Sequence, residues 1–346
     1  MGSRLSNQVS RVNNHGGLHP LHVTLGKFIA VLLMSSLSLS GFADNDQALT
    51  SKATANGDLM SVSPAKLDVV VSIRPIALIL EELLGDLIST RVLVPTNASP
   101  HDYTLKASDV KALYGADYVV WLGPELEQFM TKLLSNISEK RTITLTATID
   151  HPNNTHLNND RHSNHTDYHE HHADNHQWLD PQAVRVMAKH IVTTLSAEHP
   201  ELANQLADKH AAFAEKIATL DQQLSEKYAL VKHTPFVVYH RGYDALVEHF
   251  ELQQLGWVTI NPEQSPSVRH LVELQKAIKE VSINKPVKCL FFEVSGNAEV
   301  ANRIAGQLGL HAVALDILGA DVRVESYSAM LNNIVTDMQA CLAIAQ

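Results

Sequence analysis

One long amphipathic pattern in the middle of the chain constrains the fold more than any other feature. Between residues 201 and 231, apolar side chains recur at steps of three and four, which is the spacing of one face of an α-helix. These positions are Leu202, Leu206, His210, Phe213, Ile217, Leu220, Leu224 and Tyr228. A helix of about 30 residues is roughly 45 Å long, which is long for one globular domain. We therefore expect either a stiff linker helix that joins two lobes or one half of a coiled coil.

Short strand-like runs alternate with helical patterns on both sides of this helix. Before it, the strand-like runs are residues 67–73, 90–94 and 117–122, with helices beginning at Pro75, Ser108 and Pro181. After it, the strand-like runs are 235–239, 255–260, 287–294 and 311–315, and the helical runs are 270–281, 298–308 and 327–343. The alternation predicts the α/β class, with parallel sheets flanked by helices. We expect an N-terminal lobe over residues 67–200 and a C-terminal lobe over residues 232–346.

The first 43 residues carry a secretory signal pattern. Arg4, Arg11 and Lys27 precede an apolar run that starts at Phe28, and no acidic residue occurs before Asp44. The run has about twelve residues, fewer than the ~20 that span a bilayer, and no cysteine lies near its end to carry a lipid. We expect residues 1–43 to be a cleaved signal peptide and residues 44–66 to be a flexible leader. The mature protein should then be soluble and periplasmic.

The two cysteines of the chain, Cys289 and Cys341, are interpreted in the light of this export signal. An oxidising compartment favours disulfide formation. Cys289 lies in a strand-like run and Cys341 in the last helical pattern, so a bond between them would attach that helix to its sheet. Two separate buried thiols are the alternative.

Histidines are concentrated between His151 and His176, where eight of them occur in 26 residues with almost no apolar side chain. Such a segment cannot build a core, so we expect a mobile loop over residues 151–175. Neutral imidazoles bind borderline metals, and the loop should therefore collect metal weakly at several positions. Its histidines are His151, His156, His162, His165, His169, His171 and His172. The alternative is a solvated insertion without a binding role.

Four other side chains are candidates for one ordered metal site. His101 follows the strand-like run 90–94, His240 follows 235–239, Asp316 follows 311–315, and His176 precedes the helix start at Pro181. Ligands in open α/β sheets bind beyond the carboxyl ends of the strands, so one ion could lie between the lobes. Three imidazoles and a carboxylate suit tetrahedral zinc, whereas manganese favours more oxygen ligands. Taken singly, each histidine could equally be a surface or core residue.

Five sequence motifs resemble those of the ZnuA family, the periplasmic zinc-binding components of ABC importers. They are Asn97-Ala-Ser-Pro-His-Asp-Tyr103, Tyr118-Val-Val-Trp-Leu-Gly-Pro-Glu-Leu-Glu127, His176-Gln-Trp-Leu-Asp-Pro181, Val238-Tyr-His-Arg-Gly-Tyr243 and Leu315-Asp-Ile-Leu-Gly319. The resemblance spans residues 67–346. It implies two lobes joined by a long helix, zinc as transported cargo between them, and delivery to an inner-membrane permease with its ATPase. We expect a monomer.

The resemblance also implies roles for individual residues. His101, His176 and His240 match the zinc ligands, and the cysteine pair matches Cys289 and Cys341. Some members place a glutamate directly before the first histidine, where this chain has Pro100. The fourth ligand should then be Asp316 or a water molecule. Manganese-binding relatives carry a carboxylate at the position of His240, which favours zinc here.

Several function classes are excluded or left as alternatives. A formal net charge of −10 argues against a nucleic-acid partner, because phosphates are bound by clusters of Lys and Arg. The chain lacks the HExxH, G-x-S-x-G and G-x-G-x-x-G motifs, so we expect no enzyme. A periplasmic zinc buffer or adhesin without a permease, a manganese-binding relative and a secreted zinc hydrolase are the alternatives.

Overall fold

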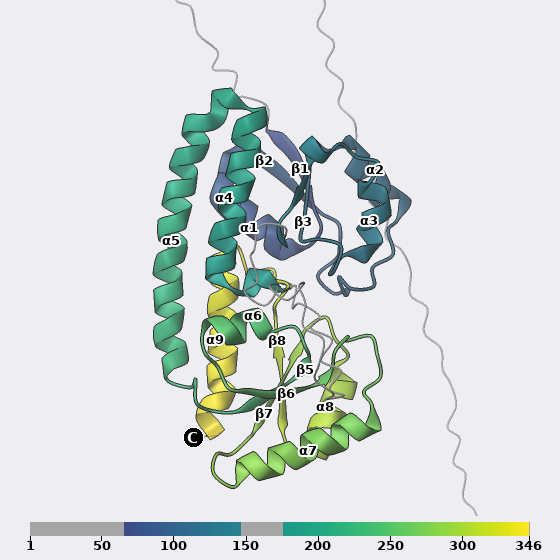
Figure 1. The fold of residues 1–346 in the computed structure, drawn as a ribbon, viewed down its shortest axis with the longest axis vertical. Helices are drawn as coiled ribbons and strands as arrows, with labels where there is room; N and C mark the ends of the chain where they lie inside the picture. The colour runs from purple at the N-terminus through teal and green to yellow at the C-terminus, as the bar shows by residue number, and fades with distance from the viewer. Residues whose placement is uncertain (1–65, 147–175, 346) are drawn as a thin grey trace, which may run out of the picture. The chain divides into compact units, whose positions relative to one another are not determined.

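The computed structural model describes residues 66–146 and 176–345 (Figure 1). The expected signal peptide at residues 1–43, the leader at 44–66 apart from its last residue, and the histidine-rich segment 151–175 lie outside the described residues. No helix within the described ranges is long and apolar enough to cross a membrane.

The N-terminal lobe contains a four-stranded parallel sheet in the order β2-β1-β3-β4. Its strands are β1 (Leu67–Val71), β2 (Ile88–Val92), β3 (Tyr118–Trp121) and β4 (Thr142–Thr144), and its helices are α1 (Arg74–Leu84), α2 (Ala107–Gly115) and α3 (Gln128–Leu134). Successive residues of a strand point to opposite faces. Val69 and Val71 pack in one core cluster and Val70 in another, so both faces of the sheet are covered. This explains the continuous apolar run of β1.

The C-terminal lobe repeats the same topology, with strand order β6-β5-β7-β8 and all pairs parallel. Its strands are β5 (Phe236–His240), β6 (Gln254–Thr259), β7 (Cys289–Glu293) and β8 (His311–Leu315). Its helices are α6 (Asp244–His249), α7 (Val268–Ser282), α8 (Ala298–Leu308) and α9 (Tyr327–Leu342). In both sheets the first strand along the chain is an inner strand, which places its carboxyl end between two neighbours.

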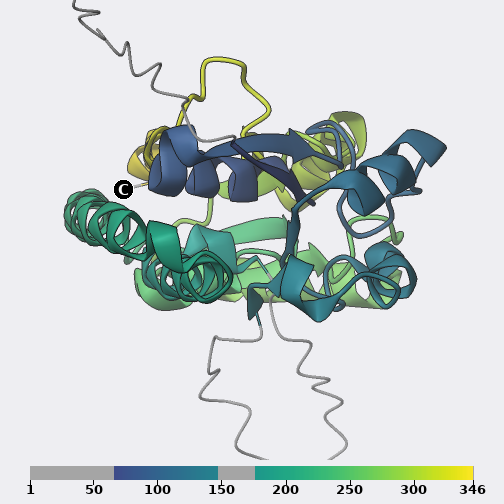
Figure 2. The ribbon, with the colours of Figure 1, turned by 90° about the horizontal axis from the view of Figure 1, so that it is seen from above.

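The long amphipathic pattern forms α5 (Ala203–Ala229), a helix of 27 residues that follows α4 (Pro181–Glu198). Six of the eight predicted positions are buried, whereas Leu202 precedes the helix and His210 is half-buried. The helix packs against α4 and α1 of the N-terminal lobe and against α9 of the C-terminal lobe. Both views show these helices together on one side of the two sheets (Figures 1 and 2). The two-lobe interpretation with a connecting helix is confirmed.

Two buried hydrogen bonds and one partly buried hydrogen bond join the lobes next to these helices. The indole Nε1 of Trp178 donates to the carbonyl of Ile317 at 2.8 Å, and the hydroxyl of Tyr327 donates to the carbonyl of Trp178 at 2.9 Å. Ser328 of α9 donates to Glu82 of α1 at 2.6 Å. The segment that follows β8 and the start of α9 are therefore held against the N-terminal lobe.

The predicted disulfide is confirmed. Cys289, the first residue of β7, is bonded to Cys341 of α9, with their Cα atoms 6.1 Å apart. Both side chains are buried, so the bond attaches the last helix to an inner strand of the sheet.

Some predicted boundaries differ from the structure. The strand expected at 90–94 is β2, which begins at Ile88 and ends at Val92, although the amides of Leu93 and Val94 still donate to the backbone of the β1 segment. Three short elements, α3, β4 and α6, are absent from the sequence prediction. They have three to seven residues, too few to produce a clear period.

Candidate metal centre

Three of the predicted site residues meet in one group that takes side chains from both lobes. One ring nitrogen of each of His101, His176 and His240 lies within 4.8 Å of those of the other two. The ring centroids are 5.0 to 5.3 Å apart. His176 and His240 are only 3 % and 2 % exposed, and His101 is half-buried. The structure therefore brings together all three predicted histidines.

Each histidine is placed by the local structure around it. His240 is the last residue of β5, and the amide of Gly242 donates back to its carbonyl at 2.9 Å. His101 lies in the loop between β2 and α2, where its amide donates to the hydroxyl of Ser99 at 3.2 Å. The site thus lies beyond the carboxyl ends of β2 and β5, as strand topology predicts.

His176 is placed by the segment that leads into α4. It precedes a short 3-10 turn, Gln177–Leu179, and its ring lies 4.9 Å from the buried ring of Trp178. Asp180 then caps α4 by accepting from the amide of Gln182 at 2.7 Å, and Pro181 occupies the first turn. The buried indole of Trp178 and the Asp180 cap fix the short turn that follows His176, and this turn positions the backbone of His176.

Glu293 is a residue of this site that the sequence did not reveal. It is the last residue of β7, is 8 % exposed, and accepts a hydrogen bond from His240 Nδ1 at 2.5 Å. Burial alone would raise the pKa of Glu293, but the electrostatic interaction and hydrogen bond with His240 and the interactions with His176 and His101 outweigh burial and lower the pKa to about 2. Its signal was an acidic residue at the end of an otherwise apolar strand.

The backbone of Gly242 also lies close to the site. A Cβ atom added there would lie 2.5 Å from Cε1 of His240 and 2.9 Å from Cε1 of His176. Both distances are shorter than van der Waals contact, so only glycine lets the backbone pass this close to the two rings.

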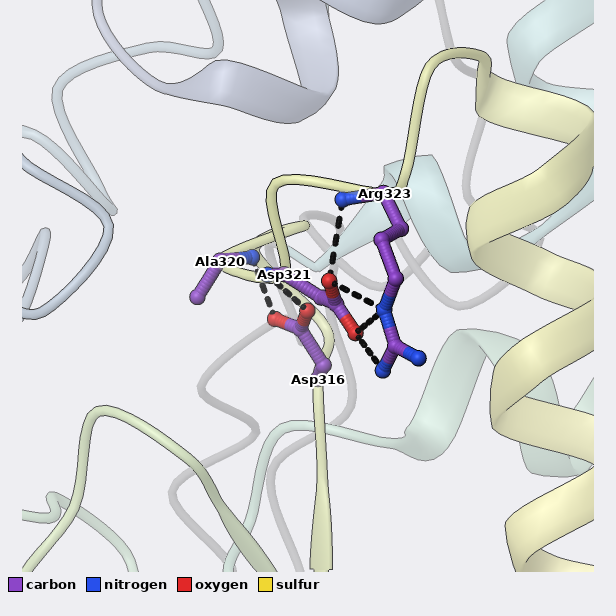
Figure 3. Close-up of polar contacts among 4 residues, drawn as sticks. All are labelled: Asp316, Ala320, Asp321 and Arg323. Atoms are coloured by element: carbon purple, nitrogen blue, oxygen red, sulfur yellow. Dashed lines mark hydrogen bonds and ion pairs between the residues drawn. The ribbon is translucent and has the colours of Figure 1, made fainter.

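Asp316 does not join the three histidines. Its two carboxylate oxygens accept from the amides of Ala320 at 2.7 Å and Asp321 at 2.9 Å, and Asp321 in turn binds Arg323 (Figure 3). The carboxylate therefore shapes the turn after β8. Within the described residues, the group that could hold an ion contains the three histidines alone.

The donor set is suited to zinc. Neutral imidazole is a common zinc ligand, with Zn–N distances of about 2.0–2.1 Å, so tetrahedral ligand nitrogens lie roughly 3.4 Å apart. The ligand nitrogens of the three rings lie within 4.8 Å of one another. Three protein ligands also leave one coordination position for water.

One further histidine, His249, lies near the start of α4 between two carboxylates. The ring of His249, the last residue of α6, contacts Asp180 through Nδ1 at 2.9 Å and Asp221 of α5 through Nε2 at 2.7 Å. Burial alone would lower the pKa of His249, but the two carboxylates outweigh it and raise the pKa to about 9. A protonated His249 therefore joins α6 of one lobe to α4 and α5.

Comparisons with known proteins agree on one family. The family described as "Zinc-uptake complex component A periplasmic" (ZnuA) matches residues 69–341. A high-affinity zinc uptake system protein ZnuA from Yersinia pestis is 30% identical over 292 residues, which cover 79% of this chain and 91% of that protein.

Solved structures show the same fold. A zinc-bound ZnuA deletion mutant is 25% identical, covers 79% of this chain and 97% of its own, and has a TM-score of 0.63. The laminin-binding protein of Streptococcus agalactiae, described as a bifunctional protein with adhesin and metal-transporting activity, is 27% identical, with coverage of 80% and 99% and a TM-score of 0.65.

Proposed function

The chain belongs to the ZnuA family of periplasmic zinc-uptake components, and from this premise we propose that it captures Zn²⁺ in the periplasm and delivers it to an inner-membrane ABC permease. The observation that carries the proposal is the group of His101, His176 and His240, three imidazoles from two lobes with ring nitrogens within 4.8 Å. The family is one of solute-binding transport proteins, and zinc is the cargo of this site.

The proposed ligand set consists of the three histidines and a water molecule. Water takes the place of Asp316 in this set because Asp316 lies outside the group formed by the three histidines. Residues 1–43 are proposed to be a signal peptide that is removed on export, and residues 151–175 a weak metal-collecting segment beside the site. The two lobes, 67–200 and 232–346, with the linker 201–231 between them, hold the ion.

The direct test is metal binding by the purified mature protein. We expect one zinc bound tightly and others weakly, with deletion of residues 151–175 removing only the weak class. His101→Ala should abolish the tight site, whereas His311→Ala, which alters an exposed histidine at the start of β8, should not. Tight binding that survives His101→Ala would contradict the ligand set.

The manganese alternative is tested by one substitution. His240→Asp replaces a nitrogen ligand with a harder oxygen ligand, so the preference should shift from zinc towards manganese. Competition dialysis with both ions measures the ranking for the wild type and the variant. The same ranking in both proteins would exclude His240 from the metal shell.

A binding role without a permease is the second candidate, favoured by the adhesin activity in the description of the Streptococcus agalactiae protein. A deletion strain grown under zinc chelation separates the two roles. Loss of zinc uptake, restored by the wild-type gene and not by the His101→Ala gene, supports delivery to a permease. Normal uptake in the deletion strain would support the adhesin or buffer role.

A further inference from the structure

We propose that Glu293 and Gly242 are positioning residues that hold the His240 ring with its Nε2 atom directed at the metal. The inference rests on the proposed zinc function, because it concerns the third ligand of the same site. Neither residue belongs to the group whose nitrogens could bind the ion.

The hydrogen bond from His240 to Glu293 selects the ring tautomer. The Nδ1 atom of His240 lies 2.5 Å from Oε1 of Glu293, and a carboxylate that accepts this hydrogen bond pairs with the tautomer that carries its proton on Nδ1. In a neutral ring the lone pair then lies on Nε2. A carboxylate behind a ligating histidine also makes the ligand more basic and orients its ring.

The strand register makes this pairing a feature of the fold. The neighbouring parallel strands β5 and β7 pair Val238 with Phe291. Two residues further along each strand, on the same face of the sheet, are His240 and Glu293. Their contact therefore follows from the register, without help from a loop.

Charge gives the carboxylate a second effect on the site. Glu293 is 8 % exposed and His240 is 2 % exposed, and a buried charge is costly unless it is paired. A divalent cation bound by three neutral imidazoles would be a buried charge without an anion among its protein ligands. The carboxylate of Glu293 supplies that anion behind His240.

Gly242 restricts the same ring through its backbone. An added Cβ would lie 2.8 Å from Nδ1 of His240 as well as against Cε1 of His240 and of His176. Any side chain at this position must therefore displace two of the three ligand rings. The contact with Glu293 and the close backbone of Gly242 therefore both restrict the orientation of the His240 ring.

The experiment measures zinc affinity by chelator competition for the wild type, Glu293→Ala, Glu293→Gln and Gly242→Ala. Loss of such a carboxylate typically weakens metal binding by about 10- to 100-fold, which we expect for Glu293→Ala. Glu293→Gln keeps an acceptor oxygen and should lose less. Gly242→Ala should weaken binding by displacing the rings. Glu299→Ala, on the exposed start of α8, and Gly306→Ala, whose Cβ would contact nothing within 4 Å, are the matched controls.

A second measurement separates positioning from general destabilisation. Two-bond ¹H–¹⁵N correlation spectra of the zinc-free protein at alkaline pH report which nitrogen of His240 is protonated. We expect Nδ1–H in the wild type and in Glu293→Gln, and a mixture of tautomers in Glu293→Ala, with cooperative unfolding retained in all three.

Distinct outcomes would overturn distinct claims. Wild-type zinc affinity in Glu293→Ala or Gly242→Ala, or an unchanged tautomer in Glu293→Ala, would overturn the positioning role while leaving the zinc site intact. Equal losses of zinc affinity in Glu293→Gln and Glu293→Ala would also contradict the positioning role, because the negative charge of Glu293 alone would then explain its effect. Failure of the wild type to bind zinc would instead refute the proposed function.

Discussion

His249 should make the stability of the protein depend on pH in the alkaline range. The two carboxylates of Asp180 and Asp221 raise the pKa of His249 to about 9, from an ordinary value of 6.5. Because the folded-state pKa is the higher one, folding stabilises the protonated ring. That stabilisation is fully present below about pH 6.5 and is lost as the pH rises through about 9.

The magnitude follows from the size of the shift. A difference of about 2.5 pKa units corresponds to at most roughly 3 kcal/mol at 1.36 kcal/mol per unit. The His249 side chain is 14% exposed and the two carboxylates are 20% and 26% exposed, so water screens part of this energy. We expect a measured effect of about 1–3 kcal/mol.

The assay is urea unfolding of zinc-free protein, wild type against His249→Gln, from about pH 6 to pH 10. The variant cannot be protonated, and pH effects of other groups are common to both proteins and cancel in the difference. The advantage of the wild type should be largest near pH 6 and should shrink by about 1–3 kcal/mol towards pH 10. A difference that stays constant with pH would refute the assignment of the protonated ring to this contact.

Three other substitutions test further contacts. Replacing Cys289 and Cys341 with serine should lower the free energy of unfolding by about 4 kcal/mol, because the disulfide closes a loop of 52 residues. Identical urea unfolding midpoints for the two proteins would contradict this. Trp178→Phe should lower the free energy of unfolding by about 1–3 kcal/mol, because it removes the donor to the buried carbonyl of Ile317. An unchanged melting temperature would show that this carbonyl accepts a hydrogen bond from another donor. Asp316→Asn should weaken the turn after β8 but leave zinc affinity unaltered, and a loss of about tenfold in chelator competition would place Asp316 among the ligands.

The elements that the sequence predicted well are those with a strong local period. The helices α5 and α8 and the strand β8 lie at or within three residues of their expected bounds, because the apolar residues of the helices repeat over several turns and β8 is a continuous apolar run after His311. In contrast, α6 has six residues and β4 has three. Elements this short are stabilised by packing against neighbours that are distant in sequence.

The sequence predicted the site residues that can be located from the end of one strand. A histidine after a strand can be located from the sequence alone, which is why His101 and His240 were found. Glu293 was missed because its role depends on β7 lying next to β5, a neighbour relation that periodicity does not contain. Asp316 follows β8 and is predicted among the ligands, but its carboxylate lies outside the histidine group and accepts hydrogen bonds from the turn after β8. The position of a residue along a strand therefore indicates which edge of the sheet it occupies, and the turn that follows decides where its side chain lies.

The disulfide and the partner of His240 lie at opposite ends of one strand. Cys289 and Glu293 begin and end β7, about 13 Å apart at 3.3 Å per residue, and the alternation of a strand puts both on the face that α9 covers. One inserted or deleted residue between them would turn Glu293 to the opposite face. The number of residues between Cys289 and Glu293 is therefore fixed by the geometry of the strand, because that number decides whether one side chain can bond α9 while the other reaches His240.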